Sequence, residues 1–126
     1  NIVNIASIAG TFGGPTSSPP YAAAKAGLVN LTTVAAASLA QYGVRVNAIA
    51  PGIINTPFHA PVDLEIGQKQ LGLDPGDHIH TRVDLIPLGR LGEPEDVAAT
   101  VAFLASDDAD HISGETITVA GAMRSL

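Results

Sequence analysis

Residues 19–42 limit the possible folds more than any other segment of this sequence. They are mainly Ala, Leu and Val, and Lys25 is the only charged residue among them. Ser18 can cap a helix here, the two prolines that follow suit its first turn, and Gly43 ends it. A surface helix shows one polar face, whereas this helix is apolar nearly all round. We therefore expect it to be buried on two sides, by a sheet and by a second subunit.

The segments on both sides of this helix have the pattern of strands. Residues 1–6 ("NIVNIA") and 44–50 ("VRVNAIA") are short and rich in β-branched residues. A strand, a long helix and a second strand form a right-handed parallel crossover. A helix at 93–106 and a strand at 114–121 continue the alternation. The sequence predicts an α/β fold: one half of a Rossmann-like, doubly wound parallel sheet, with three strands and two main helices.

A long stretch rich in Pro and Gly, residues 51–92, separates the second strand from the second helix. It has no long hydrophobic period, so we expect a loop with short helices around 63–71 and 77–85. So long an irregular segment is usually functional, either as a lid or as a binding loop.

Composition excludes several classes of protein. The 126 residues suffice for one domain, which we expect to span 1–126, and there is no cysteine for a disulfide or a thiolate metal site. The net charge of −6, with all twelve acidic residues from Asp63 onward, argues against a nucleic-acid partner. No uninterrupted apolar run approaches the roughly 18 residues of a membrane span, and no signal peptide opens the chain. We expect no membrane and a cytoplasmic protein.

The start of the chain suggests that a longer protein surrounds it. The first residue is Asn1, and residues 1–6 already resemble a buried strand. Three strands with two covering helices would leave the 1–6 edge open and apolar, and an open edge invites aggregation. We expect a preceding N-terminal half to cover it.

Three features of the sequence fall where ligands bind in open α/β sheets, beyond the carboxyl ends of the strands. Ser7 follows the first strand, Tyr21 opens the helix beyond it, and Pro51-Gly52 follows the second strand. Tyr21 and Lys25 are four positions apart and share one helix face. A nearby ammonium favours the phenolate form of a tyrosine. Tyr21 could then exchange a proton with an alcohol or carbonyl, and Ser7 could hydrogen-bond the same oxygen.

Each of these features also has a purely structural interpretation. A helical tyrosine is more often a packing residue, a serine after a strand is most often a turn residue, and Pro-Gly often only ends a strand. A Tyr-x-x-x-Lys pair also arises by chance. The functional interpretation depends on all three features meeting at the strand ends.

Other polar residues carry less weight. Asp74, Asp77, His78 and His80 lie close together, but a strong metal site needs a fuller cluster, so we expect no metal. His59 could face a substrate or simply be a surface residue, and the sequence favours neither.

The motifs resemble those of the short-chain dehydrogenase/reductase family, in particular the C-terminal half of a 3-oxoacyl-reductase-like member. "IVNIASIAG" is similar to the family's serine strand, with Ser7 in the catalytic position, and "YAAAK" matches its Tyr-x-x-x-Lys. "VRVNAIAPGIINTPF" resembles the next strand and the nicotinamide loop. In that segment the matching residues are Asn47, Pro51, Gly52, Ile54 and Thr56.

The resemblance implies an oxidoreductase that transfers a hydride between NAD or NADP and a carbonyl or secondary alcohol. Tyr21 would be the proton donor or acceptor, Lys25 would favour its phenolate and bind the nicotinamide ribose, and Ser7 would orient the substrate oxygen.

The resemblance also implies the surroundings of the site. Pro51 and Gly52 would lie against the cofactor, Ile54 and Thr56 would contact the nicotinamide carboxamide, and 57–91 would be the substrate lid. The family commonly forms homodimers and homotetramers through the long helix, here 19–42.

The sequence departs from the family pattern in three places. Ser7 and Tyr21 are fourteen positions apart, one or two more than is usual, and Ala120 and Ala122 replace the Asp and second Gly of a usual Asp-Gly-Gly. The third departure is that no glycine-rich dinucleotide fingerprint is present. Two alternatives therefore stay open: a truncated, catalytically incomplete chain acting at most as an assembly subunit, and an epimerase or dehydratase that uses the same tyrosine.

Overall fold

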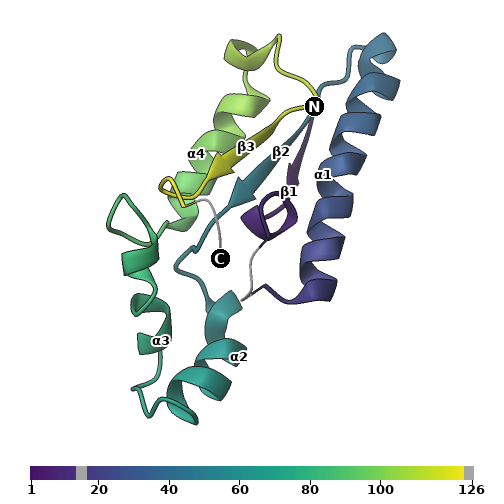
Figure 1. Cartoon of the computed structure of the whole chain (residues 1–126). Helices are drawn as coiled ribbons and strands as arrows, with labels where there is room; N and C mark the ends of the chain where they lie inside the picture. The colour runs from purple at the N-terminus through teal and green to yellow at the C-terminus, as the bar shows by residue number, and fades with distance from the viewer. Residues whose placement is uncertain (14–16, 124–126) are drawn as a thin grey trace.

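The computed structural model describes residues 1–13 and 17–123, and its centre is a three-stranded parallel sheet (Figure 1). The strands are β1 (Ile2–Ile5), β2 (Val46–Pro51) and β3 (Thr116–Val119), in the order β1-β2-β3. Asn4 pairs with Ala48, and Ala48 with Thr116. This confirms the α/β fold, although each strand is shorter or shifted by a residue or two, as expected for boundaries set from sequence.

Two long helices cover opposite faces of the sheet. Helix α1 (Pro19–Leu39), extended by a 3-10 turn at Ala40–Tyr42, and helix α4 (Pro94–Ala105) flank it on either side (Figure 1). Successive side chains of a strand point to opposite faces. Asn4 bonds to Thr32 of α1, whereas its neighbour Val3 packs in the cluster below α4.

Small residues allow α1 to lie close to the sheet. Ala48 and Ala50 of β2 are fully buried on its side. Thr32, also fully buried, donates to the carbonyl of Leu28 at 2.8 Å and accepts from Asn4 at 3.0 Å. Each of these polar groups therefore has a partner at a site where an unpaired one would be costly.

The α4 face holds the apolar cluster of the sheet. Leu104 and Ile49 are fully buried there, with Val3, Val101 and Ile117 packed around them. Because burial of each large apolar side chain contributes about 1.5–3 kcal/mol, this cluster is a main source of the body's stability.

Both ends of α4 are fixed by charged side chains. At its N-terminus the Asp96 carboxylate accepts from the backbone N–H of Glu93 at 2.8 Å. At its C-terminus the Arg45 guanidinium donates to the carbonyls of Leu104 and Ser106 at 2.9 and 3.1 Å. These charges have the signs that the helix dipole favours.

The expectation that Ser18 caps α1 through its side chain is wrong. Ser18 occupies the N-cap position, but its hydroxyl makes no capping bond. A cap oxygen accepts from the second or third helical N–H. The second helical residue, Pro20, has no N–H, and the N–H of the third, Tyr21, does not bond to the Ser18 side chain.

Helix α1 is covered on one side only within the chain. Thr32 and Ala36 are its buried residues, whereas Leu31 and Val34 are 57% and 54% exposed. A second subunit on the outer side stays a prediction. By length and composition alone, Pro19–Tyr42 could also cross a membrane, so the sequence expectation of no such segment needs correction. That match is weak evidence, because a helix that packs on a sheet passes the same test.

Residues 57–91 form an excursion of short helical turns that projects beyond the sheet (Figure 1). Its elements in chain order are a 3-10 turn (Pro57–His59), α2 (Ala60–Val62), a π-helical turn (Asp63–Gln68), α3 (Asp77–His80) and a 3-10 turn (Val83–Leu85). The helical segments expected around 63–71 and 77–85 are present, although shorter. The connection between β1 and α1 contains a 3-10 turn (Ile8–Gly10), and its residues 14–16 lie outside the described residues.

Candidate active site

Ser7 is held at the carboxyl end of β1 by the turn that it starts. It is the N-terminal cap of the turn Ile8–Gly10, and its Oγ accepts from the backbone N–H of Ala9 at 3.2 Å. The residue is 8% exposed. The hydroxyl oxygen is thereby fixed in place, and its own proton is not used by this bond.

Tyr21 and Lys25 lie on the first turns of α1, as the sequence predicts. The Nζ atom of Lys25 is 5.7 Å from the centroid of the Tyr21 ring. It also donates to the carbonyl of Ile5, the last residue of β1, at 2.8 Å. Lys25 therefore joins the tyrosine to the strand end that Ser7 follows.

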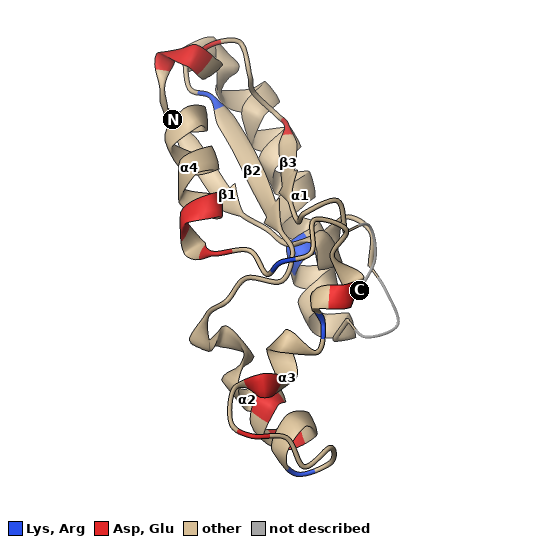
Figure 2. Cartoon of the chain, turned by 90° about the vertical axis from the view of Figure 1, so that its left-hand side faces the viewer, with Lys and Arg blue, Asp and Glu red and all other residues tan. Residues whose placement is uncertain are grey.

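No acidic side chain belongs to the elements that carry these residues. All twelve carboxylates lie from Asp63 onward, in the excursion, around α4 and before β3 (Figure 2). Among the described residues, the ammonium of Lys25 donates to the carbonyl of Ile5 rather than to a carboxylate. The ammonium is therefore available to stabilise negative charge nearby.

Gly10 brings the serine turn into direct contact with the lysine turn. A Cβ atom at this position would lie 2.5 Å from the carbonyl carbon of Lys25 and 2.6 Å from the nitrogen of Ala26. Backbone atoms cannot yield as a flexible side chain can. Only glycine therefore permits this packing, which sets the spacing between the 7–10 turn and α1.

The segment after β2 holds the expected cofactor-loop residues. Pro51 ends β2, and Gly52 donates to the carbonyl of Val119 at 3.0 Å. A Cβ at Gly52 would lie 2.8 Å from the Cβ of Ala120. Ile54 then pairs with Gly92 in a short bridge.

Thr56 and Ile54 are half-buried, and the Thr56 hydroxyl donates weakly to the Ile54 carbonyl at 3.4 Å. Together with Pro51 and Gly52, they lie at the carboxyl end of β2, whereas Ser7 follows the carboxyl end of β1. Both strand ends are at the same end of the parallel sheet. Among the described residues, the hydrogen bonds and ring contacts of Tyr21 and Lys25 do not involve these four residues.

One aromatic residue of the excursion, Phe58, reaches the tyrosine, and His59 packs against Phe58. The ring centroid of Phe58 is 6.0 Å from that of Tyr21, with the planes inclined at 40°. The His59 ring stands edge-on to Phe58, with centroids 5.5 Å apart. Burial lowers the pKa of His59, the positive charge of Arg82 lowers it further, and a hydrogen bond to Ile54 opposes both effects. The neutral imidazole is therefore favoured.

A buried carboxylate holds the excursion together, and sequence reasoning missed it. Asp63 is 7% exposed and accepts from Gln68 Nε2 at 2.9 Å and from the backbone N–H groups of Gly76 and His78 at 2.9 and 3.2 Å. The bond from Gly76 is the main cause of its lowered pKa, followed by that from Gln68. Because these donors lie up to fifteen positions away, no local pattern could reveal them.

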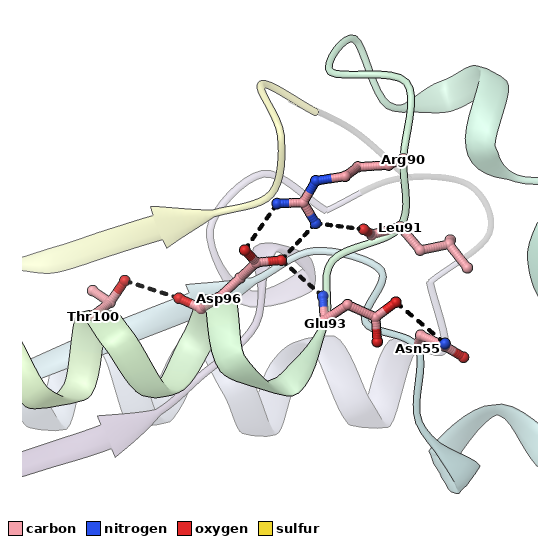
Figure 3. Close-up of polar contacts among 6 residues, drawn as sticks. All are labelled: Asn55, Arg90, Leu91, Glu93, Asp96 and Thr100. Atoms are coloured by element: carbon pink, nitrogen blue, oxygen red, sulfur yellow. Dashed lines mark hydrogen bonds and ion pairs between the residues drawn. The ribbon is translucent and has the colours of Figure 1, made fainter.

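The far end of the excursion is fastened to α4, also by residues that the motifs did not single out. Arg90 donates to both oxygens of Asp96 at 2.7 and 2.8 Å, and Asn55 donates to Glu93 at 3.3 Å (Figure 3). The guanidinium of Arg90 and the N–H of Glu93 hold the pKa of Asp96 well below its usual range. In the sequence, the only sign of this ion pair was the closeness of Arg90 to the acidic residues that begin α4.

A cavity among the described residues lies elsewhere. It measures about 470 Å³ and lies between the Leu88–Gly92 segment, the start of α4 and the end of β3. Neither Ser7, Tyr21 nor Lys25 lines it. Its rim includes Ala122, a non-glycine residue with φ of 67°, where the family pattern has glycine. Within 1–13 and 17–123, no three His, Cys, Asp or Glu side chains are grouped to hold a metal ion.

Comparison with known proteins identifies a family over nearly the whole chain. The sequence profile described as Enoyl-(Acyl carrier protein) reductase matches residues 1–123. A (3R)-3-hydroxyacyl-CoA dehydrogenase of Canis lupus familiaris is 41% identical over 98% of this chain and 42% of its own length. A 3-oxoacyl-[acyl-carrier-protein] reductase, FabG, of Thermotoga maritima is 38% identical over 98% of this chain and 45% of its own.

A solved structure shares the fold as well. The crystal structure of a 3-oxoacyl-[acyl-carrier protein] reductase with bound NAD from Brucella melitensis superposes with a TM-score of 0.78 at 35% identity. It covers 98% of this chain and 40% of that one. The chain thus spans about two fifths of the length of the relatives it matches.

Proposed function

Because the chain belongs to the short-chain dehydrogenase/reductase family, we propose that it carries the catalytic end of an NAD(P)-dependent oxidoreductase acting on a carbonyl/alcohol pair. The observation that carries the proposal is the position of Lys25, whose Nζ bonds to the end of β1 at 2.8 Å and lies 5.7 Å from the Tyr21 ring. A proton-exchanging hydroxyl, a cation and a serine thereby lie near one another at the carboxyl end of β1.

The chain's own residues would move and hold the proton of the reaction. Tyr21 donates its hydroxyl proton to the substrate oxygen in reduction and accepts it in oxidation. Lys25 stabilises the resulting phenolate by its positive charge. Ser7, fixed through Ala9, donates a hydrogen bond to the same substrate oxygen and so orients the reacting carbon.

The residues after β2 are the proposed contacts of the nicotinamide. Gly52 packs closely against Ala120, and the half-buried Ile54 and Thr56 follow it. Lys25 uses one of its three N–H donors on Ile5, so two are left for a ribose. When bound, the nicotinamide supplies or takes up the hydride. The choice between NAD and NADP is part of the proposal to be tested.

The substrate class that we propose is a 3-oxoacyl/3-hydroxyacyl pair, because similar proteins are named for such compounds. The 57–91 excursion is proposed as the substrate lid, since Phe58 within it contacts Tyr21. Assembly as a homodimer or homotetramer through α1 and a cytoplasmic location are proposed with it.

Replacement of the tyrosine tests this function. In the intact gene product, Tyr21→Phe should lower kcat by about 10²–10⁴-fold, because the proton donor is removed, while NADH and NADPH still bind. Tyr42→Phe is the matched control: Tyr42 is 72% exposed and lies at the other end of the same helix, so turnover should be unchanged. Unchanged turnover in Tyr21→Phe would contradict the proposed role of Tyr21 as the proton donor.

The exposed outer side of α1 favours a second candidate, in which the 126-residue chain by itself serves as an assembly subunit without turnover. Titration of the purified chain with NADH and NADPH separates the two candidates. Tight binding with turnover would defeat this second one.

A further inference from the structure

Phe58 is an exposed aromatic residue at an unusual place. Its side chain is 67% exposed, and its ring lies beside Tyr21, the proposed proton donor. Large apolar side chains on a surface need no explanation when they are scattered singly. This one adjoins the only hydroxyl that the proposed chemistry uses for proton transfer, so whatever binds at Tyr21 also meets Phe58.

Two ring contacts hold the orientation of Phe58. Tyr21 lies on one side at 6.0 Å between centroids, inclined at 40°, and His59 stands edge-on at 5.5 Å. Such ring pairs stabilise a structure beyond the burial of their surface area. The ring is therefore positioned before a ligand arrives, which lowers the entropic cost of using it as a contact surface.

The backbone that carries Phe58 is also fixed at both sides. On its N-terminal side, the backbone N–H of Asn55 donates to the carbonyl of Gly92 at 2.8 Å. Phe58 precedes the turn of Asp63, whose carboxylate binds three donors of the excursion. Phe58 thus sits on a supported connection between the sheet and the excursion rather than at a loop tip.

We propose that Phe58 is a specificity-determining residue: its ring forms an apolar wall beside Tyr21 that contacts the hydrocarbon chain of the substrate and favours longer chains. This rests on the proposed function, because it places the reacting oxygen at Tyr21. The wall is apolar and faces water in the free protein, so contact with a hydrocarbon removes two apolar surfaces from water at once.

Binding of an acyl series tests the wall without depending on turnover. The probes are 3-hydroxyacyl N-acetylcysteamine thioesters with four, six, eight and ten acyl carbons, titrated calorimetrically into the intact gene product. In the unmodified protein, Kd should fall by about two- to fourfold for each added CH2. In Phe58→Ala this dependence should flatten, and in Phe58→Leu, which keeps an apolar side chain, it should largely return.

The control variant is Leu71→Ala. Leu71 is an apolar side chain of the same excursion, is 59% exposed and lies thirteen positions further along. Its removal should leave the chain-length dependence intact. If the dependence of Kd on chain length is the same in Phe58→Ala and in the unmodified protein, the proposed role of Phe58 is wrong. It is also wrong if Leu71→Ala loses this dependence to the same extent as Phe58→Ala.

Turnover of the matching 3-oxoacyl thioesters with NADH and NADPH separates this inference from the function on which it rests. Absence of turnover in the unmodified protein contradicts the proposed function, whereas the effect of Phe58→Ala on the Kd series still decides the wall. With turnover present, kcat/KM should lose its chain-length dependence in Phe58→Ala in parallel with Kd.

Discussion

The sheet with α1 and α4 and the 57–91 excursion are held together by different interactions. In the sheet and its helices, apolar side chains such as Ile49 and Leu104 are fully buried between elements that are far apart in sequence. The excursion also contributes buried apolar residues, which pack in a second cluster with Ile8 and Ile53: Ile79, Ile86 and Leu91. Of its other large apolar side chains, Phe58, Leu64 and Leu71 are at least half exposed, and polar anchors add to its organisation.

This difference matches the two tasks of a binding enzyme. Ser7, Tyr21 and Lys25 belong to elements fixed by strand register and by the packing of Gly10 on α1. Phe58 belongs to the excursion, where it is 67% exposed and lies between the Asn55 and Asp63 anchors. Under the proposed function, the proton-transfer residues would lie on the sheet and α1, and the substrate-contacting ring would lie on the excursion.

The largest effect should come from removing a core side chain of the sheet region. Leu104→Ala should lower the free energy of unfolding by about 2–5 kcal/mol, because it leaves a cavity beside Ile49. Leu64→Ala, in the half-exposed π-helical turn of the excursion, should change it by about 0.5 kcal/mol or less. Urea denaturation of the intact gene product measures both, and similar losses in the two variants would remove the distinction between the regions.

Gly10→Ala should damage catalysis through position. The added methyl cannot fit against Lys25, so the serine turn and α1 must separate, and displacements of this kind can cost about 100-fold in kcat. Gly27→Ala, with open space at its Cβ on the same helix, should retain normal kcat. Steady-state kinetics with a 3-oxoacyl thioester compares the pair, and equal activity in both would show that the Gly10 contact does not set the site.

Asp63 should give the stability of the excursion a pH dependence. Its pKa is lowered in the folded chain by Gly76 and Gln68, so the stability it contributes is fully present above about 3.8 and is lost as the pH falls through the folded value. Hydrogen exchange, corrected for its intrinsic rate, should accelerate over residues 63–80 in that range, and in Asp63→Asn it should already be severalfold faster at pH 6.

Asp74→Asn serves as the control for that experiment, because Asp74 is an exposed carboxylate of the same excursion. The rates of hydrogen exchange over residues 63–80 in Asp74→Asn should equal those of the unmodified protein at each pH. If Asp63→Asn kept the same acid-induced acceleration as the unmodified protein, another group would be responsible.

The sheet and the two long helices could be predicted because their signals are local. β-Branched runs, the prolines at the starts of α1 and α4, and Gly43 after α1 each mark an element within a few residues. The order of these elements implied that Ser7 and Tyr21 lie near the same strand end.

Much of what the sequence did not reveal depends on partners far apart in the chain. Arg45 caps α4 across about sixty positions, and the Asp63 carboxylate accepts from Gly76, thirteen positions away. The contact of Phe58 with Tyr21 crosses a whole strand–helix unit. Two features were missed at short range: the Arg90–Asp96 pair, six positions apart, and the absence of a capping bond from the Ser18 hydroxyl.

The fate of a deuterium label tests the central claim, hydride transfer at the Tyr21 end of the sheet, most directly. The intact gene product is incubated with a 3-oxoacyl thioester and with NADH or NADPH deuterated at C4 of the nicotinamide, and the product is analysed by mass spectrometry. The account predicts a 3-hydroxyacyl product with one deuterium on the carbinol carbon, formed only when Tyr21 is present. A product that forms without deuterium, as an epimerase or dehydratase would give, or equal labelling by Tyr21→Phe, would contradict it.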